Sequence, residues 1–163
     1  MEWKARDVMS AEVRTVGPEM LLPDLERALI EQGLSGFPVV DGGRLVGIVS
    51  RSDVVRQLCV EQSVAETLSD YYADPGAGAS GPVESFEAIG QRVGARIERL
   101  RVKDVMIHDL ITVSPEDSLR DVAATLLARR VHRLPVVEGG RLVGIVTSMD
   151  VVRLFAEDRV RPR

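Results

Sequence analysis

Two short segments of the sequence pair a hydroxyl side chain with a carboxylate three positions later: Ser50 with Asp53, and Thr147 with Asp150. A carboxylate can accept two hydrogen bonds from a vicinal diol. A hydroxyl group together with free backbone N–H groups at a helix start suits an anion. The same spacing is close to that of a capping box, which stabilises a helix without any ligand. The sequence leaves both interpretations open, and the two roles can coexist.

The chain contains one unit twice. When the 163-residue sequence is aligned with itself at a shift of 97 positions, Asp7-Val8-Met9 falls on Asp104-Val105-Met106 without a gap. The run from Pro38 to Val49 falls on the run from Pro135 to Val146, and eleven of these twelve pairs are identical. Such self-similarity at a fixed shift is typical of a duplication. We therefore expect two similar units, each with one hydroxyl–carboxylate pair at the same place.

Each unit is predicted to fold as β-α-β-β-α, with a short first strand near residues 13–16 or 110–113. Apolar residues at helical spacing predict the first helix of each unit. The second copy has a helix-start signal at Ser114-Pro115-Glu116. The predicted apolar stripes are Leu22, Leu25, Leu29 and Ile30 in the first copy, and Leu119, Val122, Ala123, Leu126 and Leu127 in the second.

Glycines mark the ends and turns of these elements. Gly33 is expected to cap the first helix of copy one, and Arg130 holds the matching place in copy two. Gly42-Gly43 and Gly139-Gly140 each join two β-rich runs, and two glycines tolerate the positive φ of a tight hairpin turn. A further helix is predicted to start at Ser50 and at Thr147, where the hydroxyl–carboxylate pairs lie.

The pattern h-P-V-V-x-x-G-x-h-h-G-h-h-[ST]-x-x-D, between a strand–helix start and a final helix, resembles the cystathionine-β-synthase (CBS) domain over about residues 6–58 and 103–155. The resemblance implies an α/β (α+β) fold, in which two β-α-β-β-α units are related by a pseudo-twofold axis and enclose two equivalent clefts. In many members the clefts bind AMP, ADP, ATP or S-adenosylmethionine. Such pairs regulate a separate enzyme, channel or transporter, are not enzymes themselves, and often form dimers.

The resemblance also implies two ligand sites. In the family the Asp takes the ribose hydroxyls, the Ser or Thr reaches a phosphate, and a basic pair from the other repeat contacts the phosphates. The strand before each pair could pack an adenine and offer backbone groups to its edge. The first expected site comprises Ile48, Val49, Ser50, Asp53, Ile111, His132 and Arg133. The second comprises Arg14, Ser35, Gly36, Ile145, Val146, Thr147 and Asp150.

The two sites are expected to differ in charge. Only the first has two adjacent basic side chains, His132 and Arg133, so phosphate-rich ligands are predicted to prefer it. The alternative is that this pair is a helix end favoured by the helix dipole. A ligand-free dimerisation scaffold, in which the hydroxyl–carboxylate pairs serve only as caps, is the alternative function.

Residues 59–97 belong to neither copy, which predicts repeat one at 1–58, an insertion at 59–97, and repeat two with its tail at 98–163. One short helix is expected around residues 64–72 and a second over 86–100, separated by a Gly-rich loop at 74–82. Gly76 to Gly81 fits the dinucleotide pattern G-x-G-x-x-G, but no strand precedes it. Cys59 is expected to be a small packing residue.

Composition excludes several classes of function. The net charge of −4 and the scarcity of aromatic residues argue against a nucleic-acid binder. One Cys and two His are too few for a Cys/His zinc site, so no metal is expected. No nucleophile–base pair is visible, so we expect no enzyme. The N-terminus has no apolar signal region and no run reaches about 18 apolar residues, so we expect a cytoplasmic protein without a membrane segment.

Overall fold

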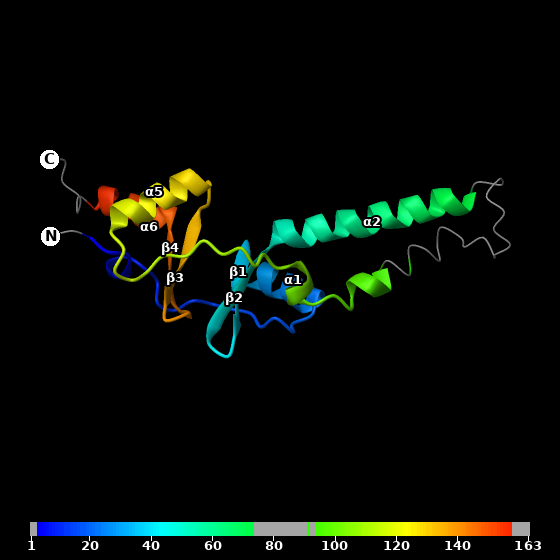
Figure 1. Cartoon of the computed structure of the whole chain (residues 1–163), viewed down its shortest axis with the longest axis horizontal. Coiled ribbons are helices and arrows are strands. Elements are labelled where there is room, and N and C mark those ends of the chain that lie inside the picture. The colour runs from blue at the N-terminus through cyan, green and yellow to red at the C-terminus, as the bar shows by residue number, and fades with distance from the viewer. Residues whose placement is uncertain (1–2, 74–90, 92–93, 158–163) are drawn as a thin grey trace. The chain divides into compact units, whose positions relative to one another are not determined.

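The structure is a computed structural model, and it describes residues 3–73, 91 and 94–157. Two compact units make up the chain (Figure 1). Unit 1 consists of Met1–Thr15, Val40–Gly47 and His108–Arg163, and unit 2 of Val16–Val39 and Ile48–Ile107. Each unit thus combines segments of both sequence repeats, and each is described by itself below.

The elements follow the predicted order in both copies. Copy one contains the 3₁₀ turn η1 (Ala5–Asp7), α1 (Leu22–Glu31), β1 (Gly36–Asp41), β2 (Arg44–Ser50) and α2 (Arg51–Ala73). Copy two contains α4 (Val102–Val105), α5 (Leu119–Arg129), β3 (Arg133–Glu138), β4 (Arg141–Thr147) and α6 (Ser148–Ala156). The predicted first strands are reduced to single parallel bridges, Val16 with Val39 and Val113 with Val136. The mixed α/β class is confirmed.

The strands form a four-stranded sheet in the order β1-β2-β4-β3. β3 and β4 pair antiparallel, and β2 meets β4 where Arg44 lies opposite Arg141. The hairpin glycines have positive φ, 54° and 82° at Gly42-Gly43 and 58° and 81° at Gly139-Gly140. The predicted primed turns are therefore confirmed, since only residues tolerant of positive φ fit both central positions.

The first helices begin and end differently from one another. The expected start of α5 at Ser114 is wrong, because the N-cap is Ser118, whose hydroxyl accepts a hydrogen bond from the Asp121 backbone. Gly33 adopts a φ of 62° after α1, as predicted, and Arg130 adopts a φ of 53° after α5. An arginine therefore holds the left-handed conformation that glycine holds in copy one.

Most of each predicted apolar stripe is buried. Leu22, Leu25 and Leu29 are buried on α1, and Leu119, Val122 and Leu126 are buried on α5. The last member of each stripe is not: Ile30 is 66% exposed and Leu127 is 80% exposed. Periodicity thus predicted the helix but extended the core face one residue too far in both copies.

Each unit is completed by a segment from the other repeat. In unit 1 the backbone N–H of Leu119 donates to the carbonyl of Trp3, and Ala5 joins the core formed by residues of copy two. In unit 2 the backbone N–H of Leu22 donates to the carbonyl of Leu100, and Val102 is fully buried. The segment around η1 from copy one therefore packs in unit 1 against residues of copy two. The corresponding segment around α4 from copy two packs in unit 2 against residues of copy one.

The helix that starts at Arg51 does not end with the sequence repeat. α2 continues without a break to Ala73, so the short helix expected around 64–72 is its last part. Of the second predicted helix, over 86–100, residues 91 and 94–97 are helical, whereas residues 86–90 and 92–93 lie outside the described residues. The predicted Gly-rich loop at 74–82 and the end of the tail, 158–163, also lie outside them. Cys59 is exposed on α2, so its predicted packing role is wrong. Among the described helices, none combines the length and apolarity needed to cross a membrane.

Candidate functional site

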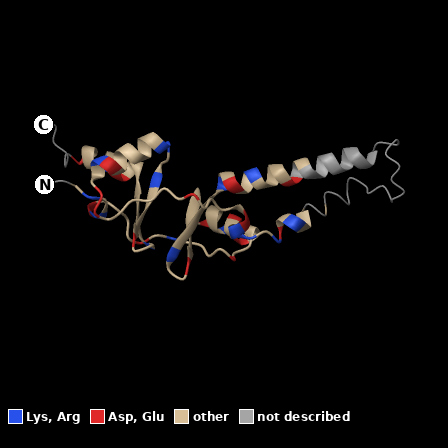
Figure 2. Ribbon diagram, in the orientation of Figure 1, with Lys and Arg blue, Asp and Glu red and all other residues tan. Residues whose placement is uncertain are grey.

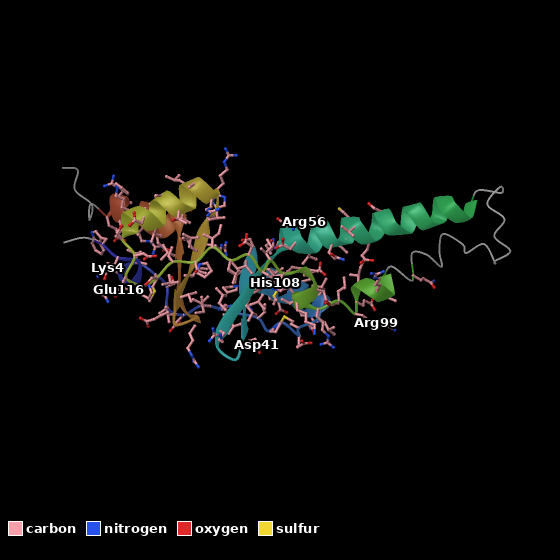
Figure 3. All side chains as sticks on the ribbon, viewed as in Figure 1. Lys4, Asp41, Arg56, Arg99, His108 and Glu116 are labelled. Carbon is pink, nitrogen blue, oxygen red and sulfur yellow. The ribbon has the colours of Figure 1, made fainter. Side chains whose placement is uncertain are left out.

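The first hydroxyl–carboxylate pair lies at the junction of β2 and α2. The Asp53 carboxylate is only 2% exposed, and its Oδ2 accepts bonds from the backbone N–H and the hydroxyl of Ser50, at 2.8 and 2.5 Å. Its Oδ1 accepts a bond from the Arg56 guanidinium at 3.0 Å. Figure 3 shows Arg56 on the first turns of α2. Both oxygens of Asp53 therefore have protein partners.

The second pair lies at the junction of β4 and α6 and forms a complete capping box. Asp150 Oδ2 accepts bonds from the backbone N–H and the hydroxyl of Thr147, at 2.8 and 2.7 Å. The Thr147 hydroxyl in turn accepts the backbone N–H of Asp150 at 3.2 Å. The Asp150 side chain is 13% exposed, and its Oδ1 lies 3.9 Å from the Arg153 guanidinium. This oxygen is beyond hydrogen-bond distance of Arg153, so Asp150 keeps more acceptor capacity than Asp53.

Both pairs thus act as helix caps, as the cap interpretation predicted. A carboxylate offers about four lone-pair positions. Two of these are used at Asp150 and three at Asp53, counting the bonds described above. The capping bonds therefore leave room for a diol at Asp150, whereas at Asp53 a diol would have to share or displace Arg56.

The strand residues before each pair are less accessible than expected. The backbone N–H and carbonyl of Ile48 are both bonded to Ile107, and those of Ile145 are both bonded to Ser10. Both backbone groups of these two residues are therefore bonded within the protein, and the expected role of the two strands toward an adenine edge stays a prediction. Val49 and Val146 are fully buried. Side chains of Ile48 and Ile145, which are half-buried, remain available for packing.

In each unit, the residues at the start of the first hairpin strand lie beside the hydroxyl–carboxylate pair of the same unit. In unit 1 the backbone N–H of Ser148 donates to the carbonyl of His132, and Arg133 lies opposite Thr147 in the β3–β4 ladder. In unit 2 the backbone N–H of Arg51 donates to the carbonyl of Ser35 at 3.0 Å. His132 is exposed and Arg133 is half-buried. Their assignment to a ligand held by Asp53 stays a prediction.

Gly36, which corresponds to Arg133 in the repeat, is closely surrounded. A Cβ atom at Gly36 would lie 2.7 Å from the Val49 carbonyl oxygen and 3.2 Å from the Ser50 Cα. The two remaining predicted site residues lie in unit 1, where Arg14 is exposed and Ile111 packs partly buried against the core. The contact between Arg56 and Asp53 was not predicted, although the sequence repeats its spacing at Asp150 and Arg153.

The part of the chain that the structure describes contains no group of three or more His, Cys, Asp or Glu side chains able to hold a metal ion. The same described residues contain no buried side-chain nitrogen or oxygen without a hydrogen-bond partner. The buried polar side-chain atoms of the described residues are therefore all satisfied within the protein.

Comparison with known proteins agrees with this architecture. The CBS domain family matches the chain twice, over residues 5–59 and 102–157. These two matches cover more than half of the sequence and coincide with the duplicated units. The chain therefore belongs to the CBS domain family and carries a tandem pair of these domains.

Individual relatives share the whole pair. An inosine-5'-monophosphate dehydrogenase of Korarchaeum cryptofilum is 32% identical over 149 residues, which are 91% of this chain and 23% of that protein. The structure of MJ1225 from Methanocaldococcus jannaschii is 26% identical with a TM-score of 0.71, over 94% of this chain and 48% of that one. A structure of CBSX2 in complex with AMP is 25% identical with a TM-score of 0.69, over 97% and 99%.

The first curated relatives are longer proteins. The chain spans 23%, 46% and 44% of the first three. The similarity therefore concerns their CBS regions, and the activity of each whole relative is a property of that protein.

Proposed function

We propose that this chain is a regulatory module that binds an adenosyl ligand, AMP, ADP, ATP or S-adenosylmethionine, without converting it. Binding would change the packing of the module, and a separate effector protein would read that change. Allosteric coupling of this kind is typically about 1–3 kcal/mol. The module is proposed to be cytoplasmic, to act as a homodimer and to need no cofactor.

The observation that carries this proposal is the geometry at Asp150. Its Oδ2 holds the helix cap, while its Oδ1 has no partner closer than the Arg153 guanidinium at 3.9 Å among the described residues. A carboxylate at a helix start with an unused oxygen can accept the hydroxyls of a ribose. The AMP found in CBSX2, a relative over nearly the whole chain, supports an adenosine-containing ligand here.

Two ligand sites are proposed, each with the residues predicted from the sequence. One contains Ser50 and Asp53 with His132 and Arg133, and the other contains Thr147 and Asp150 with Ser35 and Gly36. The basic pair favours phosphate-rich ligands at the first site. The open carboxylate oxygen at Asp150 favours nucleoside binding at the second site, because a ribose hydroxyl does not have to displace an arginine from that oxygen.

Thermal melting with each adenosyl compound tests the function. A ligand that binds only the folded chain adds about 2.7 kcal/mol of stability at 100 times its dissociation constant. We expect a rise in melting temperature with at least one of AMP, ADP, ATP and S-adenosylmethionine. Inosine and free phosphate are the controls. No shift with any adenosyl compound at millimolar concentration would contradict the proposal.

A variant at Arg133 tests its phosphate role. Arg133→Ala should weaken binding of ATP and ADP more than binding of adenosine, because only the nucleotides carry phosphates for a guanidinium to grip. Isothermal titration with the three compounds measures the difference. Equal losses for all three would overturn the assignment of Arg133 to the phosphates.

The second candidate is a ligand-free interaction scaffold. The specific observation in its favour is that Thr147 and Asp150 form a complete capping box without any ligand. In this case Asp150→Ala would lower the melting temperature and every adenosyl compound would leave it unchanged. The melting experiment therefore separates the two candidates.

A further inference from the structure

Arg56 binds the carboxylate oxygen of Asp53 that the helix cap does not use. Asp53 Oδ2 accepts both bonds from Ser50, whereas Oδ1 accepts a bond from the Arg56 guanidinium at 3.0 Å. Side chains three positions apart on a helix are neighbours on its surface. Figure 2 shows acidic and basic residues close together on the first turns of α2. The oxygen that a ribose hydroxyl would need is therefore already bonded to the protein.

The second copy offers the same pair of residues without this bond. Asp150 forms the same cap, but the guanidinium of Arg153 lies 3.9 Å from its Oδ1. The Arg56 and Arg153 side chains are almost equally exposed, at 65% and 67%. Their carboxylates are not, since the Asp53 side chain is 2% exposed and the Asp150 side chain 13%. The closer arginine therefore goes with the more covered carboxylate.

The bond from Arg56 changes what a ligand has to do at Asp53. At Asp150 a ribose hydroxyl can donate to Oδ1 without breaking a hydrogen bond of the protein. At Asp53 the same hydroxyl has to replace a guanidinium, which attracts the carboxylate by charge as well as by hydrogen bonding. The exchange is therefore unfavourable. Its cost is small, because Arg56 is mostly exposed and water solvates it once it is released.

We propose that Arg56 is a specificity-determining residue that competes with the ribose of an adenosyl ligand for Asp53. The arginine lowers the affinity of this site for every ligand that uses the ribose hydroxyls. Such a ligand then needs further contacts, such as those of a phosphate, to bind there. The arginine of copy two leaves the Asp150 site without this competition. The inference rests on the proposed function, because it requires a ribose at Asp53.

Removal of the arginine in a chain with one working site tests the competition. Asp150→Ala removes the second site, and this chain is compared with the same chain that also carries Arg56→Ala. Because exposed ion pairs contribute little, AMP should bind about three- to fivefold more tightly to the double variant. Isothermal titration calorimetry with AMP measures the two affinities. An unchanged or weaker affinity after Arg56→Ala would overturn the inference.

The gain in affinity should depend on the ribose hydroxyls. The 2′,3′-dideoxy analogue of AMP has the same base and phosphate but no ribose hydroxyl that Asp53 could accept. Arg56→Ala should therefore leave the affinity for this analogue unchanged while it raises the affinity for AMP. If Arg56 acted only through the shape or the overall charge of the site, both compounds would respond alike. Equal changes for the two compounds would thus contradict the competition.

Arg153→Ala is the matched control in the second copy. In a chain with Asp53→Ala only the Asp150 site remains, and Arg153 lies beyond hydrogen-bond distance of its carboxylate. Arg153→Ala should therefore leave the AMP affinity of that chain unchanged. A gain equal to that from Arg56→Ala would show a general effect of removing a surface arginine, and it would overturn the assignment to Arg56.

Failure of this inference and failure of the proposed function give different results. If AMP binds neither the Asp150→Ala chain nor its Arg56→Ala version, the inference is overturned. The melting experiment on the unmodified chain with the other adenosyl compounds then decides the proposed function separately. If Asp150→Ala or Asp53→Ala fails to fold, the Asn variants replace them, because an amide oxygen can still accept the capping bonds.

Discussion

The two hydroxyl–carboxylate pairs began as copies, and their backbones still form the same turn. Ser50 and Thr147 each donate a backbone and a hydroxyl hydrogen bond to the following Asp. The carboxylates differ beyond this shared turn. Asp53 is held on its second oxygen by Arg56 at 3.0 Å, whereas Arg153 stays 3.9 Å from Asp150. The two copies therefore share the helix cap, and they differ in whether the second carboxylate oxygen of the Asp is already bonded to an arginine.

The segments beside the pairs diverged further. Gly36 in unit 2 and Arg133 in unit 1 hold matched positions, but the space at Gly36 is closed by the Val49 carbonyl. Copy one therefore has no room for the side chain that copy two carries. The asymmetry of charge between the repeats thus has a steric cause as well as a difference in residue type.

Among these variants, Gly36→Ala is expected to lower the free energy of unfolding most. The added Cβ would lie 2.7 Å from a backbone oxygen, so the strand has to shift, at a cost of about 1–3 kcal/mol. Urea unfolding measures the loss. Arg133→Ala, the matched change in copy two, should cost less than Gly36→Ala because it adds no atoms. Equal stability of Gly36→Ala and the unmodified chain would show that the two segments are equivalent.

A smaller effect is expected at the ends of the first helices. Gly33→Ala places a side chain at a φ of 62° with open space around it, so only backbone strain acts, at about 1 kcal/mol. Arg130→Gly relieves the same strain in copy two but loosens the unfolded chain, for a net gain of about 0.5 kcal/mol. Thermal melting should move in opposite directions for the two variants. A destabilised Arg130→Gly would mean that the Arg130 side chain does more than end the helix.

The smallest effect concerns the exchanged N-terminal segment. A hydrogen bond from Lys4, with help from the charge of Arg6 and against some desolvation, lowers the pKa of Glu116 below 4.5. Figure 3 shows Lys4 and Glu116 side by side. A carboxylate with a lowered pKa stabilises the fold above its unfolded pKa, and this contribution is lost as the pH falls through the folded pKa.

Glu116→Gln should therefore flatten the acid side of the stability profile below pH 4.5. Urea unfolding over a pH series measures this slope. The control is Glu138→Gln, because Glu138 is exposed and forms no ion pair within the described part of the chain. The same acid slope in Glu116→Gln and the unmodified chain would contradict the pairing with Lys4.

Local features of the fold were predictable from the sequence. The hairpin turns follow from Gly42-Gly43 and Gly139-Gly140, and the helix starts at the two pairs follow from Ser50 and Thr147, because these signals act within a few residues. The duplication predicted that both copies share them. Burial on one face of α1 and α5 also followed from periodicity.

Long-range features were not predictable. The repeated sequence does not show that Ala5 packs in the core of copy two, because the two copies are alike and Ala5 fits the pattern of either core. The bonds from Ile107 to Ile48 and from Ser10 to Ile145 depend on this exchange, so they too were missed. Periodicity marks Ile30 and Leu127 as apolar but cannot tell that these two side chains lie outside the core.

Titration of AMP into the unmodified chain and into Asp150→Ala tests the ligand-binding claim most directly. A carboxylate that accepts ribose hydroxyls should contribute about 1.5–3 kcal/mol, so Asp150→Ala should weaken AMP by that amount. Asp121→Ala is the control, because the Asp121 carboxylate accepts a bond from the Ser118 hydroxyl at the start of α5, outside the proposed sites. That variant should lose stability and keep its AMP affinity. An Asp150→Ala chain that melts lower yet binds AMP as tightly as the unmodified chain would contradict the account and leave Asp150 as a cap alone.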